Sequence, residues 1–215
     1  MTKSVYSLLL SDAVVSALDR QAYEMNTSRS ALANQILAEH LSYVTPEKRL
    51  HDVFSAMENL LSEVYGFQLM LQPSDSMLSL RTALDYKYNP SVRYSVELNK
   101  SDAPSGRIKA VLRSQNGDLL SVFSRFFRLW DGVEKQFCGD VQSETSDGKY
   151  VREIGGLRGR ELSPSELGEY ISGYLKLLDG SLKLFFSLLS SPEEAAKRIK
   201  LAYEDFIRDE KEVLL

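Results

Sequence analysis

The sequence has little of the chemistry that catalytic and metal sites require. Its 215 residues include one cysteine, Cys138, and two histidines, His40 and His51. A single cysteine excludes an intramolecular disulfide. Neither histidine has cysteine or carboxylate partners at a recognised metal-ligand spacing, and phosphate-loop and nucleophile-elbow motifs are missing. We therefore expect neither an enzyme nor a protein that depends on a metal or another cofactor.

Long apolar runs are also missing. The longest, around Leu182 to Leu189, is interrupted by Lys183 and flanked by Asp179, so we expect no membrane span. The N-terminus lacks the basic region, apolar run and cleavage site of a signal peptide. With 43% hydrophobic and 26% charged residues, the composition is that of an ordinary folded chain. We expect a cytoplasmic location and no membrane partner.

Residues 3 to 43 carry the most informative pattern. The alternating segment from Lys3 to Leu10 predicts a strand, and Ser11 or Asp12 can cap a helix after it. A turn at Asn26 precedes a second helix, for which the next two residues supply cap oxygens. The apolar stripes are Val14, Leu18 and Ala22 in the first helix and Leu32, Ile36, Leu37 and Leu41 in the second. One strand and two helices are too few to close a core, so we infer that a second copy of the chain completes it.

The segment resembles the ribbon-helix-helix family of DNA-binding proteins, the CopG, Arc and MetJ group. The matching residues are Leu10-Ser11-Asp12, Val14-Val15-Ser16-Ala17-Leu18-Asp19-Arg20 and Asn26-Thr27-Ser28-Arg29-Ser30. Asn26 stands where the family usually has glycine, and asparagine tolerates the left-handed conformation that this position demands. The resemblance covers about a fifth of the chain.

The resemblance implies a homodimer, or a higher even oligomer, that binds double-stranded DNA and regulates transcription. Two strands, one from each chain, pair antiparallel in the major groove. The start of each second helix binds a phosphate. In the family's register Tyr6, Leu8 and Leu10 face the dimer core. The expected DNA contacts are Lys3, Val5, Ser7 and Leu9 on the ribbon and Thr27, Ser28, Arg29 and Ser30 at the helix start.

Two features leave an alternative open. The outward ribbon positions of the family normally carry a long polar or basic residue, whereas this chain has Ser7 between Val5 and Leu9. Residues 1 to 49 hold five basic and five acidic side chains, and a neutral module gains little affinity from phosphates. In the alternative, the chain is a dimeric protein-interaction or assembly protein whose motif serves only dimerisation.

A second domain follows the motif. Thr45 and Pro46 predict a new helix that runs to about Tyr65, so we place a module over residues 1–44 and an α+β domain over residues 45–215. That domain would supply further dimer contacts or sense an unknown ligand or protein partner.

From Phe67 to Leu112 the apolar period is two, which predicts four short antiparallel strands. The helical period returns after Gln115, and Ser163 and Ser191 begin two more capped helices. The predicted fold class is α+β: a ribbon-helix-helix, a helix, a four-stranded antiparallel sheet and three C-terminal helices. Residues 139 to 161 are predicted to form a long loop, with a short strand around 149 to 154.

The solvent face of the predicted sheet is basic, although the chain has a net charge of -4. Asp85 and Glu97 are its acidic residues, and its basic residues are Arg81, Arg93, Arg107, Lys109 and Arg113. This face could attract phosphate from DNA or from a small anionic ligand. The alternative is a solvated face whose charges discourage aggregation.

Two further motifs each have two interpretations. The aromatic series Phe123, Phe126, Phe127 and Trp130 lines a ligand pocket or, as such stripes usually do, forms core. Residues 155–160, with three glycines and two arginines, present an anion site or a basic surface loop.

Overall fold

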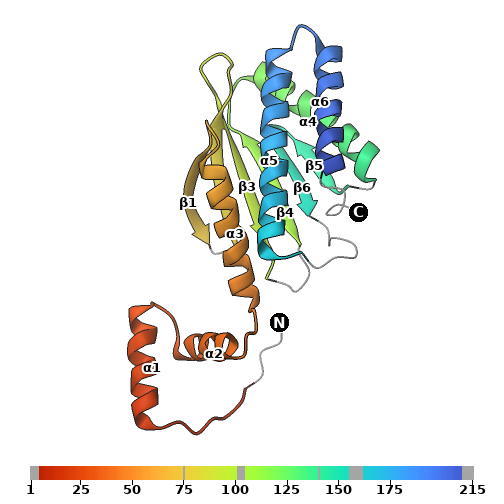
Figure 1. Cartoon of the computed structure of the whole chain (residues 1–215). Helices are drawn as coiled ribbons and strands as arrows, with labels where there is room; N and C mark the ends of the chain where they lie inside the picture. Colours follow the sequence, from red (N-terminus) through yellow and green to blue (C-terminus); the bar gives the residue numbers. More distant parts are fainter. Residues whose placement is uncertain (1–4, 75, 101–104, 140, 155–161, 210–215) are drawn as a thin grey trace. The chain divides into compact units, whose positions relative to one another are not determined.

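The computed structural model describes residues 5–74, 76–100, 105–139, 141–154 and 162–209 (Figure 1). It divides into two compact units, Met1–Arg49 and Leu50–Leu215, and each is considered by itself below. Within the described residues the fold is α+β, with six helices and one antiparallel sheet. None of these helices is both long enough and apolar enough to cross a bilayer.

The first unit contains two short helices. α1 (Asp12–Glu24) follows Ser11, whose side chain makes no capping hydrogen bond. α2 (Arg29–His40) follows Ser28, whose side chain accepts a hydrogen bond from the Ala31 backbone N–H at 3.2 Å. Asn26, between the helices, has φ of 51°. This is the left-handed conformation predicted for the position, which asparagine adopts more readily than most residues.

The strand predicted for residues 3 to 10 is not formed in the single chain. Residues 5 to 11 have no regular secondary structure, and residues 1 to 4, with Lys3, lie outside the described part. A strand obtains its backbone hydrogen bonds from a neighbouring strand, and no described strand pairs with this segment. The strand is therefore absent from one chain, and its formation with a second chain stays a prediction.

α3 (Pro46–Ser62) begins at the predicted proline, and the Thr45 hydroxyl accepts a hydrogen bond from the Lys48 backbone N–H at 3.2 Å. Its apolar face contributes Val53, Met57 and Leu61 to the core of the second unit, where all three are completely buried. The local capping signal and the helical period therefore predicted this element correctly.

The sheet has six strands in the described residues, where the sequence predicted four. The first four are β1 (Gln68–Ser74), β2 (Met77–Ala83), β3 (Ser91–Leu98) and β4 (Gly106–Leu112). The other two are β5 (Ser143–Ser146) and β6 (Lys149–Ile154), and the order in the sheet is β1-β2-β3-β4-β6-β5. The short strand predicted around residues 149 to 154 is confirmed, but much of the predicted long loop is a hairpin. Its Asp147-Gly148 turn is a hairpin signal that the sequence analysis missed.

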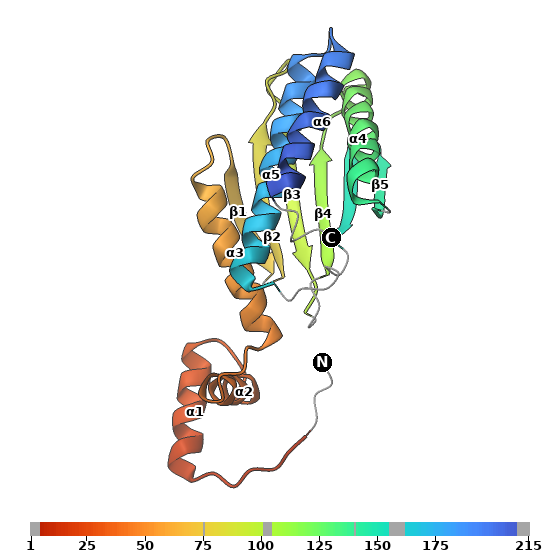
Figure 2. The same ribbon diagram turned by 45° about the vertical axis from the view of Figure 1, so that its right-hand side comes forward.

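The helices of the second unit lie along one face of the sheet (Figure 2). They are α3, α4 (Gly117–Cys138), α5 (Pro164–Ser187) and α6 (Pro192–Asp209). Strand residues facing them, such as Leu80, Tyr94 and Ala110, are completely buried, whereas the alternate residues are mostly exposed or half-buried. We call this second side the outer face of the sheet.

The aromatic series of α4 forms core and not a ligand pocket. Phe123, Phe126, Phe127 and Trp130 are completely buried. Phe127 stacks on Tyr150 of β6 with 4.3 Å between ring centroids, and Trp130 meets Tyr203 of α6 edge-on at 5.2 Å. α4 is thus covered by the sheet and by another helix, as its wide apolar surface predicts.

Candidate nucleic-acid interface

The four residues predicted to bind a phosphate lie together at the start of α2. Thr27 and Ser28 precede the helix, and Arg29 and Ser30 are its first two residues; all four are exposed. The first N–H groups of a helix have no partner within the helix, and its dipole places partial positive charge there. This arrangement suits an anion, although the cap bond of Ser28 already uses the N–H of Ala31.

Arg29 is held by an acidic side chain of the preceding helix. Its Nε and Nη2 donate hydrogen bonds to the two carboxylate oxygens of Asp19, each at 2.5 Å. The hydrogen bond from Arg29 holds the pKa of the Asp19 carboxyl below its ordinary value, and the same bond raises the pKa of the guanidinium. A phosphate at the helix start would have to share or displace this partner.

The predicted ribbon residues within the described part are uncovered in the single chain. Val5 is 98% exposed, and Ser7 and Leu9 are exposed as well. Tyr6 and Leu8, which the family's register places in a dimer core, are 83% and 68% exposed. In the described part of this segment, Val5 and Leu9 are more exposed than Tyr6, Leu8 and Leu10, but neither side is buried.

The helical stripes of the first unit are only partly buried. Ala22 and Leu32 are buried and Leu18 is half-buried. Val14, Ile36, Leu37 and Leu41 are exposed, which differs from the buried stripe that their spacing predicts. One chain contributes too few elements to this unit to cover both sides of its helices.

Four of the five basic residues predicted on the sheet are on the outer face, and Arg113 directly follows β4. The structure separates the five into two groups. Arg107 and Lys109 share one carboxylate, because Arg107 Nε and Lys109 Nζ donate to Glu97 at 2.6 Å and 2.5 Å. Partial burial works to raise the pKa of Glu97, but the hydrogen bonds from Lys109 and Arg107 outweigh it and lower that pKa. Glu97 balances one of these two positive charges, and Glu153 on β6, directly opposite Arg107 in the strand register, places a second carboxylate beside them.

The second group lies toward the other end of the same strands. Arg81 on β2 is directly opposite Arg93 on β3, and Arg113 follows β4 by one residue. Lys149 on β6, which the sequence analysis did not name, is in the same row as Arg93, with Val111 between them. Asp85, predicted on this face, is an exposed residue of the β2–β3 connection.

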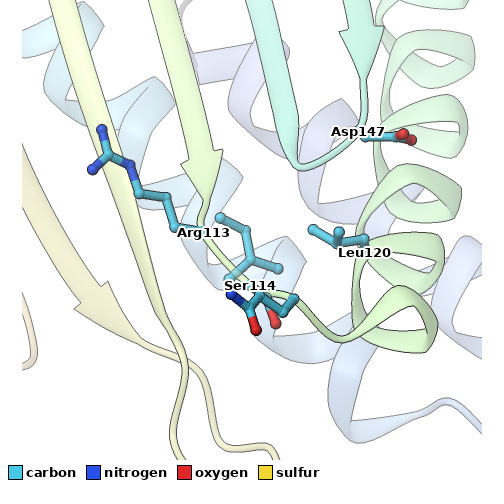
Figure 3. A pocket seen from close by; sticks show the side chains of 6 residues that line it. Arg113, Ser114, Leu120 and Asp147 are labelled. Atoms are coloured by element: carbon cyan, nitrogen blue, oxygen red, sulfur yellow. The ribbon is translucent and has the colours of Figure 1, made fainter.

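Arg113 borders a shallow depression at the end of β4. The depression is lined by Leu112, Arg113, Ser114, Gln115, Leu120 and Asp147. Figure 3 shows the Arg113 side chain extending away from Asp147 and Leu120, which lie on the other side of Ser114. The arginine is therefore directed away from the nearest acidic residue of the lining.

Sequence reasoning missed a buried polar cluster in the second unit. The Glu134 carboxylate is completely buried and accepts hydrogen bonds from Tyr150 at 2.7 Å, Tyr174 at 3.0 Å and Arg152 Nε at 2.8 Å. Burial, followed by the charge of Glu134, raises the pKa of Tyr174 well above its ordinary value. The cluster fills the interior between α4, α5 and β6, and we interpret it as part of the core.

The described residues offer no candidate metal site. They contain no group of three or more His, Cys, Asp or Glu side chains able to hold an ion. His40 and His51 are both exposed. The glycine- and arginine-rich motif at residues 155–160 lies outside the described part.

Comparison of the chain with protein-family models, with curated proteins and with solved structures found no match.

Proposed function

We propose that the chain is a sequence-specific DNA-binding protein, a regulator of transcription, that acts as a homodimer through a ribbon-helix-helix. In this proposal the segment from Lys3 to Leu10 pairs antiparallel with the same segment of a second chain and enters the major groove. Ser7, between Val5 and Leu9, meets base edges with one hydroxyl and two apolar contacts. Thr27 to Ser30 bind a phosphate at the start of α2.

The observation that carries the proposal is the uncovered apolar surface of the first unit. Its buried hydrophobic side chains among the described residues are Ala22, Leu32 and Ala38. Its exposed ones include Tyr6, Leu8, Leu10, Val14, Ile36, Leu37 and Leu41. An exposed apolar surface of this extent is typical of an interface. A second copy would supply both the strand that the extended segment lacks and the cover that the helices lack.

A second function is favoured by the ion pair between Arg29 and Asp19. The cation expected at the phosphate is already bound by a carboxylate, and Val5 and Leu9 make the outer side of the segment apolar. In this alternative the unit only pairs two chains, and the assembled dimer binds another protein. The two functions differ in whether the purified chain binds DNA.

The test is fluorescence anisotropy with the full chain and duplex fragments tiled across its own promoter, at two salt concentrations. Regulation predicts tight binding to one fragment that weakens with salt and with Arg29→Ala. Arg20→Ala is the matched control, because Arg20 is an exposed arginine on α1 outside the expected contacts. Absence of binding to every fragment at low salt would contradict the proposal and favour the assembly protein.

Dimerisation is tested separately by sedimentation equilibrium. The wild-type chain should sediment as a dimer or a higher even oligomer, and Leu37→Asp should weaken the association because it places a charge on the exposed stripe. Leu201→Asp is the control, since Leu201 is an equally exposed leucine of the second unit. A monomeric wild-type chain at micromolar concentration would contradict the proposed homodimer.

A further inference from the structure

The outer face of the sheet has two ends of different electrostatic character. At one end Arg107 and Lys109 pair with Glu97, and Glu153 lies directly opposite Arg107 in the register. At the other, the strand register places Arg81, Arg93, Val111 and Lys149 in one row across β2, β3, β4 and β6. Arg113, one residue beyond β4, continues this end. We call Arg81, Arg93, Arg113 and Lys149 the basic end of the outer face.

The cations of the basic end are exposed, and no acidic side chain among the described residues pairs with them. In the part of the chain that the structure describes, none of these four side chains forms an ion pair. Arg81 Nε donates to the neutral Gln68 Oε1 at 2.8 Å. Asp85 and Asp147 lie in the adjoining connections, and Arg113 extends away from Asp147 (Figure 3). Glu144 on β5 is also close, two residues from Ser146, the register partner of Lys149. The positive charge of this end is therefore available to a ligand.

The arrangement has a cost for the folded chain. Arg81 and Arg93 are directly opposite on neighbouring strands, and like charges at such positions are destabilising. An anion that lies between the two guanidinium groups would remove this repulsion. Arginine is suited to the task because its planar fork binds phosphate oxygens in pairs. The row from β2 to β6 covers three strand spacings, roughly 14 Å, which is long enough for more than one phosphate.

The charge distribution of the chain selects the kind of anion. The first unit has equal numbers of acidic and basic residues, and the whole chain has a net charge of -4. A DNA-binding protein draws much of its affinity from neutralised phosphates. If the first unit supplies base contacts, cations elsewhere in the chain must supply most of the phosphate contacts. Among the described residues of the second unit, the basic end is a surface that matches this requirement.

We infer that the basic end of the outer face binds the phosphate backbone of duplex DNA and gives the second unit a contact that does not depend on sequence. The inference rests on the proposed function for the identity of the polyanion. In this inference the first unit recognises the base sequence of the DNA, and the second unit adds affinity for DNA of any sequence. Base contacts and backbone contacts have these separate roles in known protein–DNA interfaces.

The experiment compares the full-length wild-type chain with Arg81→Gln/Arg93→Gln by fluorescence anisotropy. Each is titrated onto the tightest promoter fragment and onto a random duplex of equal length, over a series of salt concentrations. Arg125→Gln/Arg128→Gln is the matched control, because it removes the same charge from exposed arginines of α4. Circular dichroism verifies that all three proteins are folded.

The expected result is weaker binding of Arg81→Gln/Arg93→Gln to both duplexes by a similar factor, on the order of tenfold per arginine at 0.1 M salt. The slope of log K against log salt should decrease by about two. The control should retain nearly wild-type affinity and slope. An additional arm titrates inorganic triphosphate, which distinguishes a small-anion site from a DNA surface.

The outcomes separate this inference from the proposed function. If Arg29→Ala weakens binding but Arg81→Gln/Arg93→Gln matches its control, the inference is overturned and the proposed function stands. If only the sheet variant loses binding, the inference holds and the role of the α2 start is overturned. Triphosphate binding that the sheet variant loses, with DNA binding unchanged, would reassign the basic end to a small anion and overturn the inference. A wild-type chain that binds no duplex overturns both.

Discussion

Arg29 and Asp19 join the start of α2 to α1 through two parallel hydrogen bonds, from Nε and Nη2 to the two carboxylate oxygens. Both side chains are exposed, so the pair contributes little to stability. Its importance is positional, because the same guanidinium is the cation expected to bind a DNA phosphate. Under the proposed function, the Asp19 carboxylate would compete with a DNA phosphate for Arg29.

Replacing Asp19 should strengthen DNA binding. In Asp19→Asn the arginine loses its charged partner, and we expect the slope of log K against log salt to steepen by up to about 0.9, one phosphate contact. Glu24→Gln removes the same charge from the exposed end of α1 and serves as the control. Anisotropy titrations at several salt concentrations measure both. An equal gain in the two variants would show that only net charge matters.

The Glu134–Arg152 pair should respond strongly to the loss of one member. Either Glu134→Gln or Arg152→Met leaves an uncompensated charge in the core, and we expect a loss of about 3 kcal/mol in the free energy of unfolding. The double variant should lose clearly less than the sum of the two single variants. Urea unfolding of the four proteins measures this cycle. Additive losses would mean that the two charges do not stabilise each other.

Asp179 should make stability depend on pH. Its carboxylate accepts hydrogen bonds from Tyr94 at 3.1 Å and from Lys183 at 2.7 Å. Burial outweighs both and raises the pKa of Asp179 above the ordinary 3.8. The folded chain then binds a proton more readily than the unfolded chain, so this group costs stability progressively as pH rises from 3.8 through the folded pKa.

The measurement is urea unfolding of the wild type and Asp179→Asn between pH 3.5 and 7, a range set by that window. The asparagine variant cannot ionise and still accepts the Tyr94 hydrogen bond. The wild type should lose stability relative to Asp179→Asn as pH rises across the window. A difference between the two proteins that stays constant with pH would contradict the raised pKa.

Gly148 should be hard to replace in the β5–β6 hairpin. Its φ is 69°, and a Cβ atom there would lie 2.5 Å from the Leu112 carbonyl oxygen. Gly139 also has a positive φ, 75°, but an added Cβ would meet no atom within 4 Å. Gly139 has ψ of -132°, outside the left-handed helical region, and we expect Gly139→Ala to cost about 1 to 3 kcal/mol from the backbone conformation alone. Gly148→Ala should cost more, because steric overlap with the Leu112 carbonyl adds to the backbone strain. Thermal unfolding compares the two, and equal losses would contradict a special role for Gly148.

The sequence by itself determined the elements whose signals are local. The helix starts at Pro46, Pro164 and Pro192 follow from a capping residue and a proline, and Ser163 caps its helix as predicted, in a capping box with Glu166. The alternation from Phe67 to Leu112 identified the first four strands, and Asn26 adopts its predicted left-handed conformation. Each signal depends on residues a few positions apart, so it can be read without knowing the rest of the fold.

Only the tertiary structure decided which distant groups meet. β6 pairs with β4 although α4 separates the two strands in the sequence. Glu134 accepts a hydrogen bond from Tyr174, which is 40 residues away in the sequence. Glu97 divides the basic face by pairing with Arg107 and Lys109, while Arg81 and Arg93 are opposite each other. These relationships depend on strand order and packing, which short-range periodicity does not encode. Residues 5 to 11 form no strand, because none of the strands in the described part of the chain supplies the backbone hydrogen bonds that a strand needs.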